Sequence, residues 1–482
     1  MLWLALALPR LPLEIHARSI SAGTPLAVAE ETANGQKLLL CDSCAVARGV
    51  RPGMSAASAW SICADLKILA RNSNAEQKAL EHVAAWATQF TSKVSLAGTV
   101  ELLLEIGGSL HLFAGLNTLL ERLRTGINEL GYEAVFALAP TPLAAQWLAR
   151  SGRAGRIVLL PADIPHALDT LPVTVMQLPA VSATALERFG IRSIGACLKF
   201  PRDGLPRRIG PSVLDQLDRA LGQKADPRPL YAVPRKFIHT LTLPAPVIHA
   251  EALLFAARRL VSELCGYLSA LSQGAQRLDF TLQHEHRQYT RFALELMAAS
   301  RDADHLLTLL REHLANLKLP QPAIAMRLAC TRSQPLDPAS KTMLPDDHLQ
   351  SEAATRLVEK LQVRLGRNAV RSLRVAEDHR PERAWTSCPP ETNEAESGTP
   401  PPGTRPLWLL AQPQLLHEDG AMPCLEGPLT LLAGPERIES GWWDGEGVAR
   451  DYFVASNPAQ AVLWIYRERN AGARWFLQGL FA

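Results

Sequence analysis

The chain has 482 residues, of which 47% are hydrophobic and 20% are charged, and its formal net charge is +3. These values are typical of a soluble globular protein with several domains, and they exclude a disordered chain. No apolar stretch approaches the roughly 20 residues that a membrane-spanning helix needs. The small positive charge permits local contacts with a polyanion but does not by itself predict them.

The chain begins with the apolar run MLWLALALPRLPLEI, which superficially looks like a secretory signal. No Lys or Arg precedes the run, Pro9 ends it, and no small-x-small cleavage site follows closely. We therefore expect a cytoplasmic protein, and the eight scattered cysteines agree with this because they show no framework spacing. Residues 2–8 instead predict a short strand buried on both faces.

Cys41 and Cys44 form a CxxC pair. A zinc site needs two further ligands, and the sequence has no second CxxC or nearby His pair. A redox motif needs a helix directly after the strand, and the segment around Gly49 interrupts it. We interpret both cysteines as ordinary packing residues, with a metal or redox role as the alternative.

The first third of the chain predicts a split βαβ sheet with an insertion after its first strand. The insertion is rich in alanine and contains a strand at 37–40, the turn RGVRPGM at 48–54 and a helix at 55–64. There follow a helix at 74–90, strands at 94–96 and 100–106, a helix at 112–130, a strand at 133–139 and a helix at 142–151.

The rest of the chain changes character twice. Short helices dominate from about 163 to 225, and a Pro-rich tether at 225–237 follows them. A second α+β unit has helices at 250–272, 302–316 and 351–363, and strands at 278–283, 290–297 and 323–329. A polar, Pro- and Gly-rich linker at 388–406 leads to a compact unit that holds tryptophans 408, 442, 443, 464 and 475.

Candidate chemistry is sparse in this pattern. Glu101 and Glu105 share one face of their strand, and burial of a carboxylate is costly, so that face is expected to meet solvent or a basic neighbour. A metal role for the pair is the alternative. His284 and His286 lack further ligands nearby, and we interpret them as part of a strand end or loop.

The segment 178–210 predicts two helices joined by a tight turn, an arrangement that presents backbone N–H groups to a phosphate. A plain structural helix pair is the alternative. The nearby basic residues favour nucleic acid, because phosphate contacts need such charges: Arg202, Arg207, Arg208, Arg235 and Lys236.

The order of these segments resembles the Y-family translesion DNA polymerases. RGVRPGM followed by ASAWSICADL is similar to their fingers, and the split βαβ sheet is similar to their palm. The helices at 178–222 resemble their thumb, and the unit at 235–375 resembles their little finger. The resemblance implies an α+β fold with the palm at 1–20 and 74–165, fingers at 21–73, thumb at 166–232, little finger at 235–375, a linker at 376–406 and a C-terminal partner-interaction domain at 407–482.

The tail narrows the resemblance. GPERIESGWWDG, RDYFVA and the final WFLQGLFA are similar to the ImuB group, the polymerase-like subunit of a bacterial mutagenesis cassette, and so is the opening LWLALALPRLPLEI. Members of this group are understood to lack the catalytic acids. They are understood to join a sliding clamp, an error-prone C-family DNA polymerase and a recombinase-related accessory protein. The resemblance therefore implies a DNA-binding adaptor of damage-induced mutagenesis that has no cofactor and no metal.

The positions of the family's catalytic acids support this implication. The Asp-x-Asp of the first strand falls on Ala7 and Pro9, and the later Asp-Glu pair falls on Val100 and Glu101. Two Mg²⁺ ions cannot be held in working geometry by one remaining acid. The Tyr and Arg that grip the triphosphate in the family fall on Ser43 and Val46, which are unsuited to that task. We conclude that the chain is not a polymerase.

The resemblance also predicts binding residues. The thumb hairpin falls on 180–184, where Ala-Val-Ser replaces the family's Gly-x-Gly, and Arg235 and Lys236 match the basic start of the little finger. We predict salt-sensitive binding to primer-template or single-stranded DNA. The predicted DNA contacts are Ser182, Thr184, Arg207, Arg208, Arg235 and Lys236.

Two further surfaces are expected to bind proteins. The clamp-binding motif of the group corresponds to ASKTMLPDDH, where Met343 and Leu344 would fill an apolar pocket although the usual Gln is missing. QPQLL at 412–416 is the alternative clamp motif. Paired tryptophans between Gly turns either fill a core or anchor a partner, and the predicted partner-binding residues are Trp442, Trp443, Arg450, Tyr452 and Trp475.

Two other functions stay open from the sequence alone. One is an active translesion polymerase that uses Glu101, Glu105 and a third acid. The other is a protein-interaction module that does not bind DNA.

Overall fold

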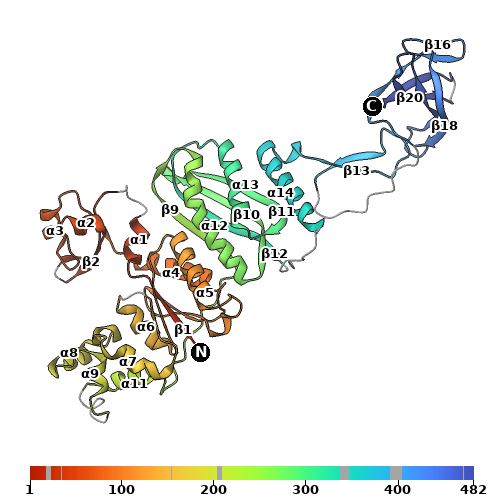
Figure 1. The fold of residues 1–482 in the computed structure, drawn as a ribbon. Helices are drawn as coiled ribbons and strands as arrows, with labels where there is room; N and C mark the ends of the chain where they lie inside the picture. The colour runs from red at the N-terminus through yellow and green to blue at the C-terminus, as the bar shows by residue number, and fades with distance from the viewer. Residues whose placement is uncertain are drawn as a thin grey trace. The chain divides into compact units, whose positions relative to one another are not determined.

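The computed structural model describes residues 1–17, 23–33, 35–152, 155–202, 209–336, 347–390, 404–469 and 472–481. The chain forms two compact units, Met1–Arg364 and Leu365–Ala482, which are coloured from red to blue along the chain in Figure 1. Across these described ranges, no helix is long and apolar enough to cross a membrane.

A five-stranded sheet, which we call the palm sheet, forms the centre of the first unit, with the order β5-β6-β1-β7-β8. Its strands are β1 (Trp3–Ala7), β5 (Val94–Leu96), β6 (Glu101–Glu105), β7 (Val135–Ala139) and β8 (Arg156–Ile157). β1 lies between β6 and β7 and pairs with both in the antiparallel sense. All of β1 is buried, which explains why its sequence is apolar at every position and confirms the predicted strand.

Helices cover both faces of the palm sheet. Their bounds are α4 (Ser73–Ala87), α5 (Leu116–Glu129) and α6 (Pro142–Arg150). α4 and α5 pack against the face that holds Leu4 and Leu6, whereas α6 packs against the face that holds Ala5 and Ala7. Because alternate strand residues point to opposite sides, Glu101 shares the α6 face with Ala7.

The insertion after β1 forms a small three-stranded sheet with the order β3-β2-β4. Its elements and the helix before it are α1 (Leu11–Ala17), β2 (Leu26–Thr32), β3 (Gly35–Cys41), α2 (Ser43–Ala47), α3 (Ala56–Ile62) and β4 (Lys67–Ala70). The strand predicted at 37–40 lies within β3. Asp42 and Ser55 begin α2 and α3 by accepting hydrogen bonds from backbone N–H groups of the first helical turns.

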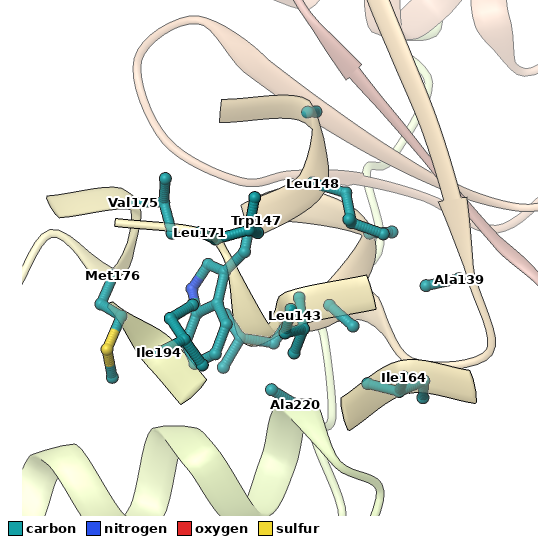
Figure 2. Packing of buried hydrophobic residues seen from close by; sticks show 14 of the residues in the cluster. Ala139, Leu143, Trp147, Leu148, Ile164, Leu171, Val175, Met176, Ile194 and Ala220 are labelled. Atoms are coloured by element: carbon teal, nitrogen blue, oxygen red, sulfur yellow. The ribbon is translucent and has the colours of Figure 1, made fainter. Parts of the chain in front are cut away.

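Short helices, which we call the thumb helices, follow the palm sheet: α7 (Ile164–Asp169), α8 (Ala180–Arg188), α9 (Ile194–Leu198) and α11 (Pro211–Ala220). Trp147 of α6 is fully buried among residues of these helices and of the loop before them, including Leu171, Met176 and Ile194 (Figure 2). This core is continuous from the palm sheet to the thumb helices, so α6 is held in place by contacts with both.

The second sheet of the first unit, the little-finger sheet, has the order β11-β10-β12-β9. Its elements are β9 (Phe237–Val247), α12 (Leu253–Ala270), β10 (Gln273–His284), β11 (Tyr289–Ser300), α13 (Ala303–Asn316), β12 (Ala323–Pro335) and α14 (Asp347–Leu365). Leu278, Phe280 and Leu282 of β10 are buried in one core with α12 and α13. The alternate residues of the strands form an opposite, open face.

The palm and the little finger meet where α12 packs against α4 (Figure 1). Trp86 of α4 lies in a slot between Gly126 of α5 and Gly266 of α12. A Cβ at Gly126 would lie 2.2 Å from Trp86 Cζ2, and one at Gly266 would lie 2.5 Å from Trp86 Cδ1. Only glycine therefore fits at either position without moving the tryptophan.

Polar contacts continue this boundary. The rings of His82 in α4 and His239 in β9 lie 3.7 Å apart between centroids. Burial lowers the pKa of His82 to about 4, and the neighbouring His239 adds to this effect. The tether before β9 is also held, because the Tyr231 N–H donates to the Val94 carbonyl at the edge strand β5, at 2.7 Å.

The second unit is a β structure. A five-stranded sheet has the order β15-β21-β20-β19-β18, and the hairpins β13-β14 and β16-β17 accompany it. The strands are β13 (Ser372–Val375), β14 (Trp385–Cys388), β15 (Trp408–Leu415), β16 (His417–Asp419), β17 (Met422–Cys424), β18 (Thr430–Ser440), β19 (Val448–Ser456), β20 (Val462–Glu468) and β21 (Trp475–Leu480). Residues 372–388, which the sequence divides between little finger and linker, form the β13-β14 hairpin within this unit.

Candidate catalytic position and nucleic-acid interface

The structure brings together the positions where the resemblance places catalytic acids. Ala7 lies directly opposite Glu101 in the β1-β6 register. The Leu8 N–H donates to the Val100 carbonyl at 2.8 Å, and Pro9 begins the turn that follows β1. Glu101 is thus the carboxylate at this position, next to the methyl group of Ala7.

Glu101 is fully engaged by side chains of α6. Arg150 donates to both carboxylate oxygens, with Nε–Oε1 at 2.7 Å and Nη2–Oε2 at 2.8 Å, and Gln146 Nε2 donates to Oε2 at 2.6 Å. Arg150 also donates to the Val175 carbonyl, and Gln146 to the Ala97 carbonyl. A carboxylate that already forms a bidentate ion pair is a poor ligand for Mg²⁺, because Mg²⁺ binds carboxylates whose oxygens are free and whose negative charge is not compensated.

The expectation that this face of β6 meets a basic neighbour is therefore met by Arg150, which the sequence analysis did not single out. Glu101 and Arg150 are 49 positions apart, so no local periodicity links them. The signal that could have identified Arg150 is its place in the last turn of a helix whose other face is wholly apolar.

Glu105 lies at the far end of β6 and is also buried. Its Oε1 accepts from the N–H groups of Leu2 and Gly107, at 3.3 and 3.1 Å, and Lys93 lies 3.7 Å from Oε2. Within the described residues these contacts hold Glu105 at the edge of the strand pair, opposite Trp3 rather than Ala7. The two acids therefore do not converge on one ion.

The two positions where the resemblance places the triphosphate-gripping residues, Ser43 and Val46, lie close in the chain to the CxxC pair. Ser43 is the first residue of α2 and is exposed, and Val46 of the same helix is 37% exposed. Cys41 ends β3 with its pKa raised by burial, and Cys44 contacts the Gly23 carbonyl at 3.4 Å. Both cysteines are free thiols in the described structure.

The thumb residues differ in accessibility. Thr184 is exposed on α8, whereas Ser182 is buried and its hydroxyl donates to the Ile209 carbonyl at 2.9 Å. The Ser182 side chain is therefore engaged within the thumb helices. Arg207 and Arg208 lie outside the described residues, and Arg202 forms an ion pair with Asp218.

The little finger carries a basic surface, of which the sequence predicts only the first part. Arg235 and Lys236 are exposed immediately before β9. On the open face of the sheet, Arg291 of β11 and Arg327 of β12 both lie opposite Thr281 of the central strand β10. They form a row that crosses the sheet.

The row lines a shallow hollow on the open face. The hollow is bounded by Thr240, Asp279, Thr281, Gln283, Tyr289, Arg291, Ala325, Arg327, Ala329 and Thr331. Arg291 and Arg327 are exposed, and within the described ranges neither has a carboxylate at ion-pair distance. Arg277, in contrast, pairs with Asp279 and Glu295.

The open face could have been found from alternation. In β12 the exposed Arg327 lies between the buried Met326 and Leu328. In β11 the exposed Arg291 lies three positions before the buried Leu294, and therefore on the opposite face of the strand. His284 and His286 do not share this face. His284 ends β10 buried, with Nε2 2.7 Å from Thr290 Oγ1, while His286 is exposed in a turn with φ 55°, as expected for a strand end.

Met343 and Leu344, which the sequence predicts to bind the clamp, lie outside the described residues. The alternative motif, QPQLL, occupies the end of β15, an edge strand. Its last residue, Leu416, is buried, and its N–H donates to the Trp475 carbonyl at 2.9 Å.

The five predicted partner-binding residues divide into two groups. Trp442 and Trp443 are 82% and 59% exposed at the tip of a turn. Tyr452 and Trp475 are buried, and the Tyr452 hydroxyl donates to Gln478 Oε1 at 2.5 Å. Arg450 supports this core, with its guanidinium 4.6 Å from the Tyr466 ring centroid and an ion pair to Glu382 at 2.9 Å.

Ion pairs of the buried Arg380 hold the exposed tryptophan turn. Arg380 donates to Asp444 Oδ2 at 2.6 Å and to Asp378 Oδ2 at 2.7 Å. The hydrogen bond from Arg380 lowers the pKa of Asp444 to about 2. The two indoles that follow Gly441 are therefore presented on a fixed backbone.

The chain is similar in sequence to known proteins. Residues 13–150 match the impB/mucB/samB family. Protein ImuB of Caulobacter vibrioides strain NA1000 / CB15N is 27% identical over 462 residues, which cover 90% of this chain and 100% of that protein. The resemblance to the ImuB group that the sequence predicts is thereby confirmed.

More distant relatives match over a shorter range. DNA polymerase IV of Escherichia fergusonii is 29% identical over 165 residues, which cover 34% of this chain and 50% of that enzyme. Among solved structures, the Y-family DNA polymerase chimera Dbh-Dpo4(243-245)-Dbh aligns with 68% of this ImuB-like chain at 16% identity and a TM-score of 0.40. DinB from Sulfolobus solfataricus aligns with 70% at a TM-score of 0.38.

Proposed function

We propose that this ImuB-like chain is a non-catalytic, DNA-binding adaptor of damage-induced translesion synthesis. The observation that carries the proposal is the Glu101–Arg150 ion pair. At the position where a working palm needs clustered, ion-accessible carboxylates, Ala7 and Val100 offer none, and Glu101 is neutralised by a guanidinium. Arg150 repels a divalent cation electrostatically, and it also occupies the Glu101 carboxylate that would have to bind the ion.

DNA binding does not depend on that lost chemistry. The open face of the little-finger sheet offers Arg291 and Arg327, and Arg235 and Lys236 extend the positive charge along the chain. Exposed cations on a polar, hollowed face suit a sugar–phosphate backbone, because such contacts neutralise phosphates and release counterions. Thr184 would add a contact from the thumb.

The adaptor role rests on the second unit. Its exposed Trp442–Trp443 pair, held by Arg380, suits a protein partner because rigid, exposed indoles are typical interface anchors. By the resemblance to the ImuB group, the partners we propose are the error-prone C-family polymerase, the recombinase-related accessory protein and the sliding clamp. For the clamp, Met343 and Leu344 remain the proposed contact.

A primer-extension assay tests the absence of catalysis. Purified full-length chain should incorporate no templated nucleotide with Mg²⁺ or Mn²⁺, on a primer-template that DNA polymerase IV extends in parallel. Robust templated incorporation that is lost in Glu101→Ala would overturn the proposal and favour an active polymerase.

A salt titration of DNA affinity tests the binding surface. Arg291→Ala/Arg327→Ala should weaken binding and flatten the slope of log affinity against log salt by about 0.7–0.9 per lost phosphate contact. Arg311→Ala, on helix α13 behind the sheet, is the matched control and should change neither. A wild-type affinity that does not depend on salt would exclude phosphate-based binding, and no DNA binding at all would favour a pure protein-interaction module.

A further inference from the structure

Three potential metal ligands meet where α4 of the palm contacts the little finger. They are His82 of α4, His239 of β9 and Glu263 of α12, and one ligand atom from each lies within 4.8 Å of the others. Among the residues that the structure describes, no other group of His, Cys, Asp or Glu side chains meets this condition. The three side chains come from segments far apart in the sequence.

The carboxylate of this cluster is already oriented. Arg259 Nε donates to Glu263 Oε1 at 3.0 Å, and the same guanidinium contacts the Tyr132 hydroxyl. The other oxygen, Oε2, faces His239 Nδ1. This contact brings two potential ligand atoms together, and a bound ion would take the place of the proton between them.

One polar atom of the cluster lacks a partner. His82 Nδ1 is buried, and across the described residues it has no hydrogen-bond partner. Buried polar atoms are rarely left unpaired in folded proteins, so an orphaned imidazole nitrogen beside two further ligands calls for a missing partner. A cavity of about 490 Å³ lined by His82, His239 and Arg259 gives space for an ion and its water.

We propose that His82, His239 and Glu263 bind a divalent transition-metal ion of the zinc type that joins the palm to the little finger. Two imidazole nitrogens and one carboxylate oxygen are a ligand set that zinc uses, with water in the fourth position. Binding would require the rings of His82 and His239, which are tilted by 40° to each other, to separate slightly, because a nitrogen of each must point at one ion.

The charges around the cluster are mixed. Arg259 and Lys78 are positive, Glu81 on α4 and Glu263 are negative, and Arg259 keeps its contact with Glu263 Oε1. The cation beside the site lowers affinity compared with a site that has only neutral and anionic neighbours.

The proposed ion would be structural rather than catalytic. α4 covers the palm face that holds Leu4 and Leu6, so the site lies across the sheet from Ala7 and Glu101. Since one ligand belongs to the palm and two belong to the little finger, the ion would favour the arrangement in which the two are docked.

The test is metal binding by untagged full-length chain after treatment with a chelator. We expect wild type and His111→Ala, which removes an exposed palm histidine, to bind one equivalent of Zn²⁺ in competition with a chromophoric chelator. His82→Ala and His239→Ala should bind it about tenfold more weakly or not at all. Equal Zn²⁺ binding by all four proteins, or none by wild type, would overturn the proposal.

Cobalt(II) distinguishes this site from the cysteines. The Co²⁺ bound by wild type should show visible d–d bands without a thiolate charge-transfer band, and His82→Ala should lose the d–d bands. Zn²⁺ should also raise the Tm of wild type but not that of His82→Ala. Where His239→Ala lowers the yield of folded protein, Glu263→Gln takes its place. If the spectrum of the bound Co²⁺ contained a thiolate charge-transfer band, the ion would be bound by cysteine and the proposed site would be refuted.

Discussion

The Glu101–Arg150 pair leads to a sharp prediction about what Glu101 does. Here the carboxylate accepts three hydrogen bonds from α6, and its side chain is only 8% exposed, against 13% for Arg150. Glu101→Ala is therefore expected to destabilise the protein rather than to change an activity.

The magnitude follows from the burial of both partners. Removing one member of a buried pair leaves the other charge uncompensated and costs about 3–5 kcal/mol. Replacing both partners by apolar residues of similar volume is often close to neutral, because neither charge then needs desolvation. Glu101→Leu/Arg150→Met should thus be far more stable than the sum of the two single variants implies.

The assay is urea unfolding of the full-length chain, followed by tryptophan fluorescence. The midpoint is compared among wild type, Glu101→Ala, the single variants Glu101→Leu and Arg150→Met, and the double variant Glu101→Leu/Arg150→Met. Trp147, one turn before Arg150 on α6, reports on this region. The reasoning is refuted if Glu101→Ala unfolds at the wild-type midpoint, or if the single-variant effects simply add.

Three further predictions follow from the packing and the charges. Gly266→Ala should cost about 1–3 kcal/mol and loosen the palm–little finger contact, because its Cβ would overlap Trp86. Ser182→Ala should lower the Tm through a lost buried hydrogen bond, worth about 1 kcal/mol, without changing DNA affinity. Asp444 has a pKa lowered to about 2 by Arg380, from 3.8, so its stabilising effect is present above about pH 4 and disappears as the pH falls to about 2. Wild type should therefore lose more stability over that range than Asp444→Asn.

Each of these has its own control. Hydrogen exchange in α4 and α12 should rise in Gly266→Ala but not in Gly108→Ala, where an added Cβ meets no atom within 4 Å. If Ser182→Ala lowered DNA affinity as much as Arg327→Ala does, the Ser182 hydroxyl would be a phosphate contact, and the prediction would be wrong. Identical acid-unfolding curves for wild type and Asp444→Asn would contradict the assigned role of the Arg380 contact.

Much of the fold follows from local sequence patterns. β1, α4 and α6 are where the apolar periodicity places them, since each is apolar toward a core and has a clear boundary residue such as Thr141, the N-cap of α6. α5 begins at Leu116 rather than at 112 because Gly115 has φ 109°, a backbone conformation that a helix cannot include. β2 and β4 were missed because LAVAEET and KILA show no alternation.

The site was harder to predict because its interactions are long-range. The positions Ala7, Val100 and Glu101 come from the resemblance and are indeed adjacent in β1 and β6. The partner Arg150 and the row formed by Arg291 and Arg327 depend on which strands and helices become neighbours, and that is a property of topology rather than of spacing. The buried Ser182 hydroxyl shows the same limit, since exposure is set by residues elsewhere in the chain.

The hydrogen bond between Tyr231 and Val94 limits how far the little finger can move away from the palm sheet. While it is intact, only residues 232–236 separate the edge of the palm sheet from Phe237, the first residue of β9. At no more than about 3.3–3.6 Å per residue, this connecting segment spans roughly 20 Å even when it is fully extended. Any larger displacement of the little finger requires this hydrogen bond to break first, so one backbone contact limits how far the little finger can move from the palm sheet.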